Sequence, residues 1–140
     1  MELVVDTAII FSFFSPGSFT RELVKSLYLS RTRLYAPQYL LEELLSLESR
    51  ICEYANIDHE DFMKTYILLS QVIEIIPSDE YKEKMCDALK ILKDHRKDAP
   101  FFALALKLRA PIWSNENRFR EQKEIEIFTT ARLKKEFGMI

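Results

Sequence analysis

The sequence predicts an α/β protein, a three-layer α/β/α sandwich with a mostly parallel central sheet. Short apolar runs rich in β-branched residues alternate along the chain with segments of helical periodicity. This alternation favours a parallel sheet, because each crossover between neighbouring strands places its helix on one face of the sheet. The chain has 140 residues, 48% of them apolar, which is enough for one packed core and too few for two ordinary domains. We therefore expect a single domain over residues 1–140.

The expected strands are runs of apolar, mostly β-branched residues bounded by polar or turn-forming ones. The first ends at Asp6, the third is stopped by Pro77, and the fourth leads directly into the polar residues 115–117. Buried parallel strands are typically continuous apolar runs, and ligands of such folds gather at the carboxyl ends of the strands. In chain order, the strands are expected at residues 3–5, 33–36, 72–76, 111–114 and 124–129.

The helices are expected where apolar residues recur every three or four positions. One follows the break at residues 15–18, and Pro37 suits the start of the next. Asp58 and Ser78 can each cap a further helix, and residues 98–108 are apolar on nearly every side, as in a helix buried against a sheet. The expected helices cover residues 19–27, 37–56, 58–69, 78–92 and 98–108, with a closing helix capped by Thr130.

The net charge argues against a strongly basic nucleic-acid-binding protein, and the glycine content argues against a protein with a glycine-rich phosphate-binding loop. The net charge is −2, so the overall field does not attract nucleic acid, and any RNA contact would need a local basic patch. Gly17 and Gly138 are the two glycines, so the chain lacks the glycine-rich loops that cradle phosphates in P-loop and dinucleotide-binding proteins.

Cys52 and Cys86 have no zinc-ligand spacing and suit the free thiols of a cytoplasmic protein. The amino-terminal apolar run contains Asp6 and no basic region before it, so we interpret it as a folded element rather than a signal peptide. No stretch reaches the length of an apolar membrane span, and we expect no membrane partner.

Three carboxylates occupy positions where an isolated charge would be costly. Asp6 lies between two apolar runs, Asp98 opens the most apolar helix, and Glu116 follows an apolar strand. Asp6 and Glu116 both follow strands and are expected to be neighbours at one edge of the sheet. Each also has an ordinary structural interpretation: Asp6 as a turn acceptor, Asp98 as a helix N-cap, and Glu116 as a loop charge near a helix N-terminus.

Several carboxylates in one cleft repel one another, and a divalent cation relieves that repulsion. Mg²⁺ and Mn²⁺ prefer oxygen ligands. A metal held in this way can activate water, orient a phosphodiester and neutralise charge on the leaving oxygen, so no Ser, His or Cys nucleophile is needed. The pattern therefore favours metal-dependent hydrolysis of phosphodiester bonds.

Four segments, VVDT, PQYLLEEL, DAPFFALAL and IWSNENRF, occur in an order that resembles the PIN-domain family, which includes VapC-like toxin ribonucleases. The resemblance runs from Leu3 to about Thr130. It implies an α/β/α sandwich and a Mg²⁺- or Mn²⁺-dependent endoribonuclease acting on RNA, frequently a toxin paired with an antitoxin protein. The family's acidic positions match the metal-binding and catalytic candidates Asp6, Glu43, Asp98 and Glu116.

Three positions depart from the family's pattern. Ala8 stands where Asn or Ser is frequent, Glu116 replaces a more frequent Asp, and Arg118 stands where a further Asp is common. A longer Glu can reach a metal, but the strict ligand spacing of Mg²⁺ makes Mn²⁺ the more tolerant ion. A catalytically degenerate PIN-like module that binds RNA or a protein is therefore the alternative.

The ligand on the second long helix is open between two neighbours. Glu42 and Glu43 point about 100° apart, and the leucines around them do not choose between them, although the family's position matches Glu43. Asp94 is a candidate for an outer position, or a loop charge.

Other groups near the candidates have weaker assignments. Cations around Asp98 and Glu116 can hold phosphates or form a solvated rim, and His59 and His95 are expected at the surface. The apolar helices expected around residues 40–51 and 62–69 can serve a homodimer or an antitoxin as readily as the core. The cations are Arg96, Lys97, Arg118, Arg120 and Lys123, and the aromatic residues assigned to the core are Phe101, Phe102 and Trp113.

Overall fold

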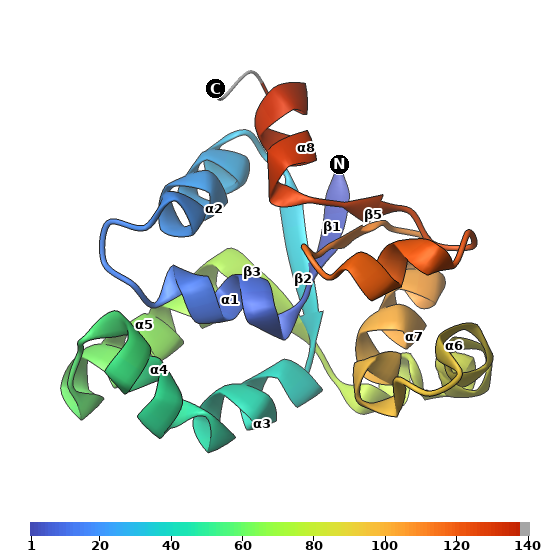
Figure 1. Ribbon diagram of the computed structural model, residues 1–140, viewed down its shortest axis with the longest axis horizontal. Helices are drawn as coiled ribbons and strands as arrows, with labels where there is room; N and C mark the ends of the chain where they lie inside the picture. Colours follow the sequence, from blue (N-terminus) through green and yellow to red (C-terminus); the bar gives the residue numbers. More distant parts are fainter. Residues whose placement is uncertain (138–140) are drawn as a thin grey trace.

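The structure, a computed structural model, describes residues 1–137 and contains a sheet in which every pair of neighbouring strands is parallel. The strand order is β3-β2-β1-β4-β5, with β1 in the middle of the sheet and of the molecule (Figure 1). This confirms the predicted fold class. The strands are β1 (Glu2–Val5), β2 (Arg33–Pro37), β3 (Ile73–Ile76), β4 (Ile112–Trp113) and β5 (Ile127–Phe128).

Helices cover both faces of this sheet. In Figure 1, α1 to α5 lie on one side of the strands and α6 and α7 on the other. The helices are α1 (Thr7–Phe13), α2 (Phe19–Leu29), α3 (Tyr39–Ser46), α4 (Glu48–Ala55), α5 (His59–Val72), α6 (Met85–Leu92), α7 (Ala99–Leu108) and α8 (Thr130–Glu136). Short 3₁₀ turns are η1 (Ser78–Glu80), η2 (Lys82–Lys84), η3 (Arg96–Asp98) and η4 (Asn117–Glu121).

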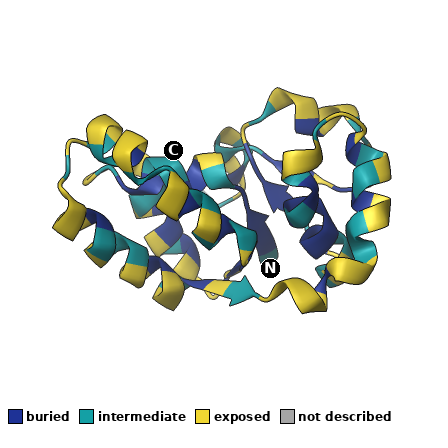
Figure 2. Ribbon diagram, turned by 90° about the horizontal axis from the view of Figure 1, so that it is seen from below, coloured by how far each residue is buried: buried dark blue, intermediate teal, exposed yellow. Residues whose placement is uncertain are grey.

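The core lies between these layers: β1, β2 and β4 are mostly buried, the edge strand β3 is partly exposed, and the helices expose their outer faces (Figure 2). Helix α7 is buried along most of its length, including Phe101 and Phe102, and packs on β1, β2 and β4. Trp113 is fully buried, and its indole N–H donates to the Thr130 hydroxyl at 3.0 Å. The core assignment of these three aromatic residues is confirmed.

Helix α1 has no counterpart among the expected helices. Its apolar residues run consecutively rather than at helical spacing, so the sequence shows no amphipathic period there. The Asp6 side chain caps the helix by accepting from the Ile9 N–H at 3.0 Å. Asp6 was expected to accept a hydrogen bond in a turn, and in the structure it accepts one as the N-cap of α1.

The prediction of one helix over residues 37–56 is wrong. Pro37 is the last residue of β2, and the chain breaks at Leu47 (φ −99°, ψ 6°) into α3 and α4. Helix α3 packs on α1 and β2, whereas α4 packs on α5. The break allows α3 and α4 to pack against different elements. The periodicity of the sequence does not show where such a break falls, because it depends on tertiary contacts.

Two further boundaries differ for local reasons. Residues 78–84 form 3₁₀ turns before α6, because apart from the buried Tyr81 they are polar or charged and offer no apolar face. The last strand is confined to Ile127–Phe128, because the Gln122 side chain accepts from the N–H groups of Glu124 and Ile125 and holds a turn there.

The closing helix is capped by Thr129 rather than Thr130. The Thr129 hydroxyl accepts a hydrogen bond from the Arg132 N–H at 3.1 Å. The Thr130 hydroxyl instead accepts hydrogen bonds from the Trp113 indole N–H and the Asn115 side-chain amide. Within residues 1–137, none of the helices has the length and apolar character needed to cross a membrane.

Candidate active site

The candidate site lies at the carboxyl ends of the two central strands β1 and β4. The chain order of the strands reverses between them, and such a switch point leaves an open crevice at this edge of a parallel sheet. Asp6 follows β1, and Ser114 and Glu116 follow β4. The Asp6 backbone N–H donates to the Trp113 carbonyl at 3.3 Å, which continues the pairing of the two strands into the site.

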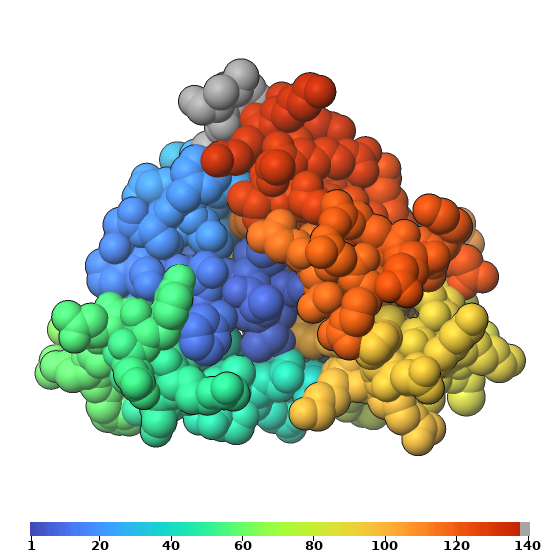
Figure 3. Space-filling view, in the orientation of Figure 1, coloured from blue at the N-terminus to red at the C-terminus, as the bar shows by residue number. Residues whose placement is uncertain are grey.

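A cleft of about 470 Å³ opens at this point, and we call it the carboxylate cleft. In Figure 3, the deep-blue amino-terminal segment comes to the surface in the middle of the face, between the teal segment of α3 and the orange segment around η4. The residues that line the cleft are Asp6, Thr7, Ala8, Phe11, Glu43, Leu47, Arg50, Asp98, Glu116, Arg118 and Phe119.

All four carboxylates expected at the site line this cleft, and they come from four separate segments of the chain. Of the two neighbours on α3, Glu43 lines the carboxylate cleft, while Glu42 is exposed and lines a separate cavity beside Tyr81. Asp94 lies in the cavity next to His95, outside the carboxylate cleft. His59 is exposed on α5 and contacts Glu48.

Asp6 is the most buried of the four carboxylates, with 6% of its surface exposed. Burial raises its pKa to about 6, and the negative charges of Asp98 and Glu116 add to the rise. The Ser114 hydroxyl and the Ile9 N–H oppose it. Asp6 is thus a buried carboxylate with two further carboxylates near it, a setting in which a bound cation would favour its charged form.

Glu43 is held by the hydroxyl of Thr7, which donates to its Oε1 at 2.5 Å. Burial raises the Glu43 pKa and Asp98 adds to the rise, while Thr7 and Lys97 lower it. The bond joins the start of α1 to α3 and so sets the position of Glu43 relative to Asp6. Thr7 is a site residue that the sequence analysis did not single out, although it follows Asp6 directly in the VVDT segment.

Asp98 stands at the N-cap position of α7, but its side chain makes no capping hydrogen bond there. The expected N-cap position of Asp98 is confirmed, but the side chain does not accept a capping hydrogen bond. It is half-buried, and burial raises its pKa; Glu116 adds to the rise, whereas Arg118, His95 and Lys97 oppose it. Its carboxylate is left available to the cleft.

Glu116 is the carboxylate with the strongest local partner. Its Oε1 accepts from Arg118 Nε at 3.1 Å and from the Arg118 backbone N–H at 3.4 Å, and its own backbone N–H donates to the Ser114 hydroxyl at 3.1 Å. The hydrogen bond from Arg118 is the main reason that the Glu116 pKa is lowered. Glu116 thus caps the turn η4, as the loop interpretation expected, and it also faces the cleft.

The donor set of the cleft suits a hard divalent cation, because it consists of carboxylate oxygens. Among residues 1–137, no three His, Cys, Asp or Glu side chains stand together as a ready-made metal site. Three of the four carboxylates accept hydrogen bonds from protein groups, Asp6 from the Ile9 N–H, Glu43 from Thr7 and Glu116 from Arg118. The residues fit a divalent ion by their chemistry, and side-chain rotation is needed to bring them onto it.

Positive charge lies on the rim of the cleft. Arg50 and Arg118 line it, and Lys97 is close enough to lower the pKa of Glu43 and of Asp98. Arg120 donates to the Asn117 side chain instead, and Lys123 lines the neighbouring cavity. The sequence does not identify Arg50 as a residue of the cleft, because its position there depends on the break between α3 and α4 at Leu47.

The family model described as PIN domain matches residues 4–137. The chain belongs to the PIN-domain family. No match to this PIN domain is found among curated proteins. Ala8 and Arg118, two of its departures from the family's pattern, both line the carboxylate cleft.

Several solved structures are similar to this PIN domain. VapBC2 from Rickettsia felis, bound to a DNA fragment from its promoter, matches with a TM-score of 0.71 and 16% identity over 92% of this chain and 98% of that chain. VapBC-1 from nontypeable Haemophilus influenzae matches with a TM-score of 0.65 and 15% identity, over 92% of this chain and 98% of that chain. VapC20 of Mycobacterium tuberculosis, a toxin that cleaves the sarcin-ricin loop, matches with a TM-score of 0.60 and 20% identity, over 89% of this chain and 98% of that chain. At these identities, the likeness shows a shared fold.

Proposed function

We propose that this PIN domain is a divalent-metal-dependent endoribonuclease. The observation that carries the proposal is the convergence of four carboxylates from four chain segments on one cleft, around the buried Asp6. An isolated structural carboxylate would be paired or solvated. A cluster whose members raise one another's pKa is instead a candidate functional site.

Each carboxylate has a proposed role. Asp6, Asp98 and Glu116 would hold Mg²⁺ or Mn²⁺, and Glu43, oriented by Thr7, would complete the site or position the attacking water. The bound ion would supply activation of water and neutralisation of charge on the leaving oxygen. The products are expected to carry 5′-phosphate and 3′-hydroxyl ends.

The basic rim would hold the RNA backbone. Arg50, Lys97 and Arg118 surround the carboxylates, and contacts of this kind fix the register of a nucleic acid without reading its sequence. With a net charge of −2, the whole protein gives no general attraction for RNA, so these local cations would carry most of the binding.

RNA cleavage by the purified chain tests the proposal. Activity is expected with Mn²⁺ or Mg²⁺, and it should be lost with EDTA and in Asp6→Asn. Asp94→Asn is the matched control, because Asp94 lies outside the carboxylate cleft and the substitution removes the same charge. Cleavage that survives both EDTA and Asp6→Asn would sink the mechanism.

A second candidate function is a degenerate PIN-like module that binds RNA or a protein without catalysis. It is favoured by the engagement of Glu116 by Arg118 and by Ala8 in the cleft. Calorimetry with Mn²⁺ separates the two candidates. Failure to bind Mn²⁺ at millimolar concentration, with RNA or partner binding retained, would support the binding module.

We further propose that the protein is a cytoplasmic toxin with an antitoxin partner, and that it forms a homodimer. The VapBC structures share its fold, and large apolar side chains stay exposed on α3, α4 and α5. They are Leu45, Tyr54, Ile67 and Leu68. A small antitoxin-like gene next to this one, whose product co-purifies with the chain and suppresses cleavage, would support the pairing, and light scattering would test the dimer.

A further inference from the structure

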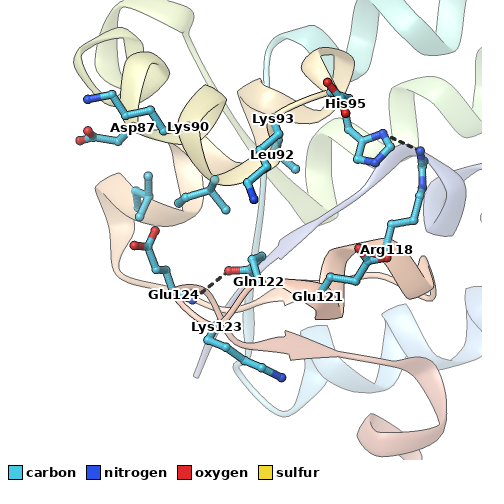
Figure 4. Close-up of a pocket in the computed structure, with 13 residues that line it drawn as sticks. Asp87, Lys90, Leu92, Lys93, His95, Arg118, Glu121, Gln122, Lys123 and Glu124 are labelled. Carbon is cyan, nitrogen blue, oxygen red and sulfur yellow. Dashed lines mark hydrogen bonds between the residues drawn. The ribbon is translucent and has the colours of Figure 1, made fainter.

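Arg118 makes contacts on two sides of its guanidinium. Nε donates to Glu116 Oε1 at 3.1 Å, and Nη1 lies 2.7 Å from Nδ1 of His95, 23 residues earlier in the chain. Figure 4 shows the side chain extending from η4 toward His95, with this contact dashed. The two contacts place one cation across the gap between η4 and the segment that leads into Asp98.

The same residue stands at the junction of two cavities. Arg118 lines the carboxylate cleft, and it also lines the neighbouring cavity of about 770 Å³ that contains His95 (Figure 4). It therefore has room on both sides. Its guanidinium can move away from Glu116 toward the larger cavity without entering the core.

The charge of Arg118 already acts on the carboxylates of the cleft. It lowers the pKa of Glu116 mainly through the hydrogen bond, and it is the largest influence that opposes the rise in the Asp98 pKa. A divalent cation would have the same effect on the same two groups. Glu116 Oε1 also accepts both the Nε–H and the backbone N–H of Arg118, so this oxygen is occupied.

We propose that Arg118 is a built-in counter-cation that competes with the divalent metal for Glu116. Metal loading requires the guanidinium to release Glu116, and the contact with His95 gives it a place to remain. The inference rests on the metal site of the proposed function. It makes Arg118 a positioning residue that weakens metal affinity by occupying one carboxylate of the cleft.

Mn²⁺ affinity measured by calorimetry on the full chain tests the inference. In Arg118→Ala, the Glu116 carboxylate is free and a nearby positive charge is gone, so Mn²⁺ is expected to bind about 3- to 10-fold more tightly. Arg118→Lys keeps the charge but loses the planar fork, and it should fall between the wild type and Arg118→Ala.

Arg120→Ala is the matched control. Arg120 lies two residues further along the same turn, and it donates to Asn117 rather than to a cleft carboxylate. The substitution removes the same charge from the same element, so its Mn²⁺ affinity should stay within about twofold of the wild type, because a screened surface charge contributes little. Circular dichroism would establish that each variant is folded.

Unchanged Mn²⁺ affinity in Arg118→Ala would overturn the inference, and weaker affinity would mean that Arg118 holds Glu116 in place for the metal. RNA cleavage is scored separately. Tighter Mn²⁺ binding by Arg118→Ala, with no RNA cleavage by the protein, would support the inference and contradict the proposed nuclease activity. Metal-dependent RNA cleavage, with the same Mn²⁺ affinity in Arg118→Ala as in the wild type, would support the nuclease activity and contradict the inference. No Mn²⁺ binding by any variant would remove both.

Discussion

At the scale of single residues, Asp6 combines two duties that oppose each other. Its carboxylate caps α1, which favours the charged form, yet burial and the neighbouring carboxylates disfavour that form and raise its pKa to about 6. The folded protein therefore carries an electrostatic cost at neutral pH in the absence of a cation. Sites that are built for a ligand commonly store such a cost.

We expect Asp6→Asn to be more stable than the wild type at pH 7. Because the folded pKa is raised above the ordinary value of 3.8, the protonated form is favoured by folding, and this contribution is lost as the pH rises from about 4 to about 6. The difference corresponds to about 2–3 kcal/mol at pH 7 and shrinks toward pH 4. Metal-free thermal unfolding from pH 4 to 8 measures it.

Asp94→Asn is the control for this measurement, because Asp94 is exposed. It should show no such pH-dependent gain. If Asp6→Asn were less stable than the wild type across the whole pH range, the cap would outweigh the burial cost.

The neighbours Glu42 and Glu43 give a second prediction at this scale. Glu43→Gln should lower RNA cleavage at least 10-fold, because a group that orients water or metal contributes about 10²–10⁴-fold. Glu42→Gln, one residue earlier on the same helix and outside the carboxylate cleft, should stay within about twofold. Single-turnover cleavage compares the two, and equal losses would contradict the assignment of Glu43.

Sequence alone could identify some of these side chains and not others. Asp6, Asp98 and Glu116 stand out because each is a charge beside an apolar run. Glu43 needed the family resemblance, since helical periodicity cannot choose between it and Glu42. The contact between Arg118 and His95 joins segments 23 residues apart, and no local pattern encodes it.

At the scale of secondary structure, some of the elements that position the site follow from the sequence and others do not. The long β-branched runs and the apolar helix α7 follow from composition and period. Helix α1, the break at Leu47 and the turn η4 do not, because each depends on which neighbours the chain packs against. These irregular pieces nevertheless carry Thr7, Arg50 and Arg118 to the cleft.

The break at Leu47 brings Arg50 to the rim, and this predicts a role in RNA binding. Arg50→Ala should weaken binding to any RNA sequence to a similar extent and reduce the salt slope by about one phosphate contact. Lys64→Ala removes one charge from the exposed face of α5 and serves as the control. Filter binding at several salt concentrations measures both, and an unchanged slope in Arg50→Ala would argue against the contact.

The turn η4 is anchored by Phe119, which predicts a coupling between packing and metal affinity. Phe119 is buried and packs edge-to-face on Phe102 of α7, with ring centroids 4.9 Å apart. Phe119→Ala should cost about 3–5 kcal/mol of unfolding free energy. It should also weaken Mn²⁺ binding, because Glu116, a proposed metal ligand, is the N-cap of the loosened turn.

Phe119→Leu keeps an apolar side chain in the same place and should recover most of both properties. Urea unfolding and calorimetry give the two readouts. Lost stability with unchanged Mn²⁺ affinity would mean that η4 does not set the position of Glu116.

At the scale of the whole molecule, the strand order places the site. Both halves of the sheet begin at its centre, so the segments after β1 and β4 face each other, and α3 and α7 bring Glu43 and Asp98 to the same edge. The sequence predicts a parallel sheet, and the general rule for such sheets then predicts an edge where ligands gather. The strand order itself is a property of the tertiary structure.

This arrangement predicts that metal binding stabilises the entire fold. An ion that binds the folded state alone adds RT ln(1 + [L]/Kd), which is about 2.7 kcal/mol at one hundred times Kd. Mn²⁺ should therefore raise the midpoint of thermal unfolding by several degrees at pH 7.5. The increase should fade below about pH 6, because a protonated Asp6 no longer serves as a ligand.

Asp98→Asn and Asp94→Asn form the matched pair for this experiment. The first removes a carboxylate from the cleft and should abolish most of the Mn²⁺ effect, whereas the second should retain it. Equal stabilisation of both variants would place the ion elsewhere on the protein. A full Mn²⁺ effect that persisted at pH 5 would mean that Asp6 is not a ligand, since its carboxyl is then largely protonated in the metal-free fold.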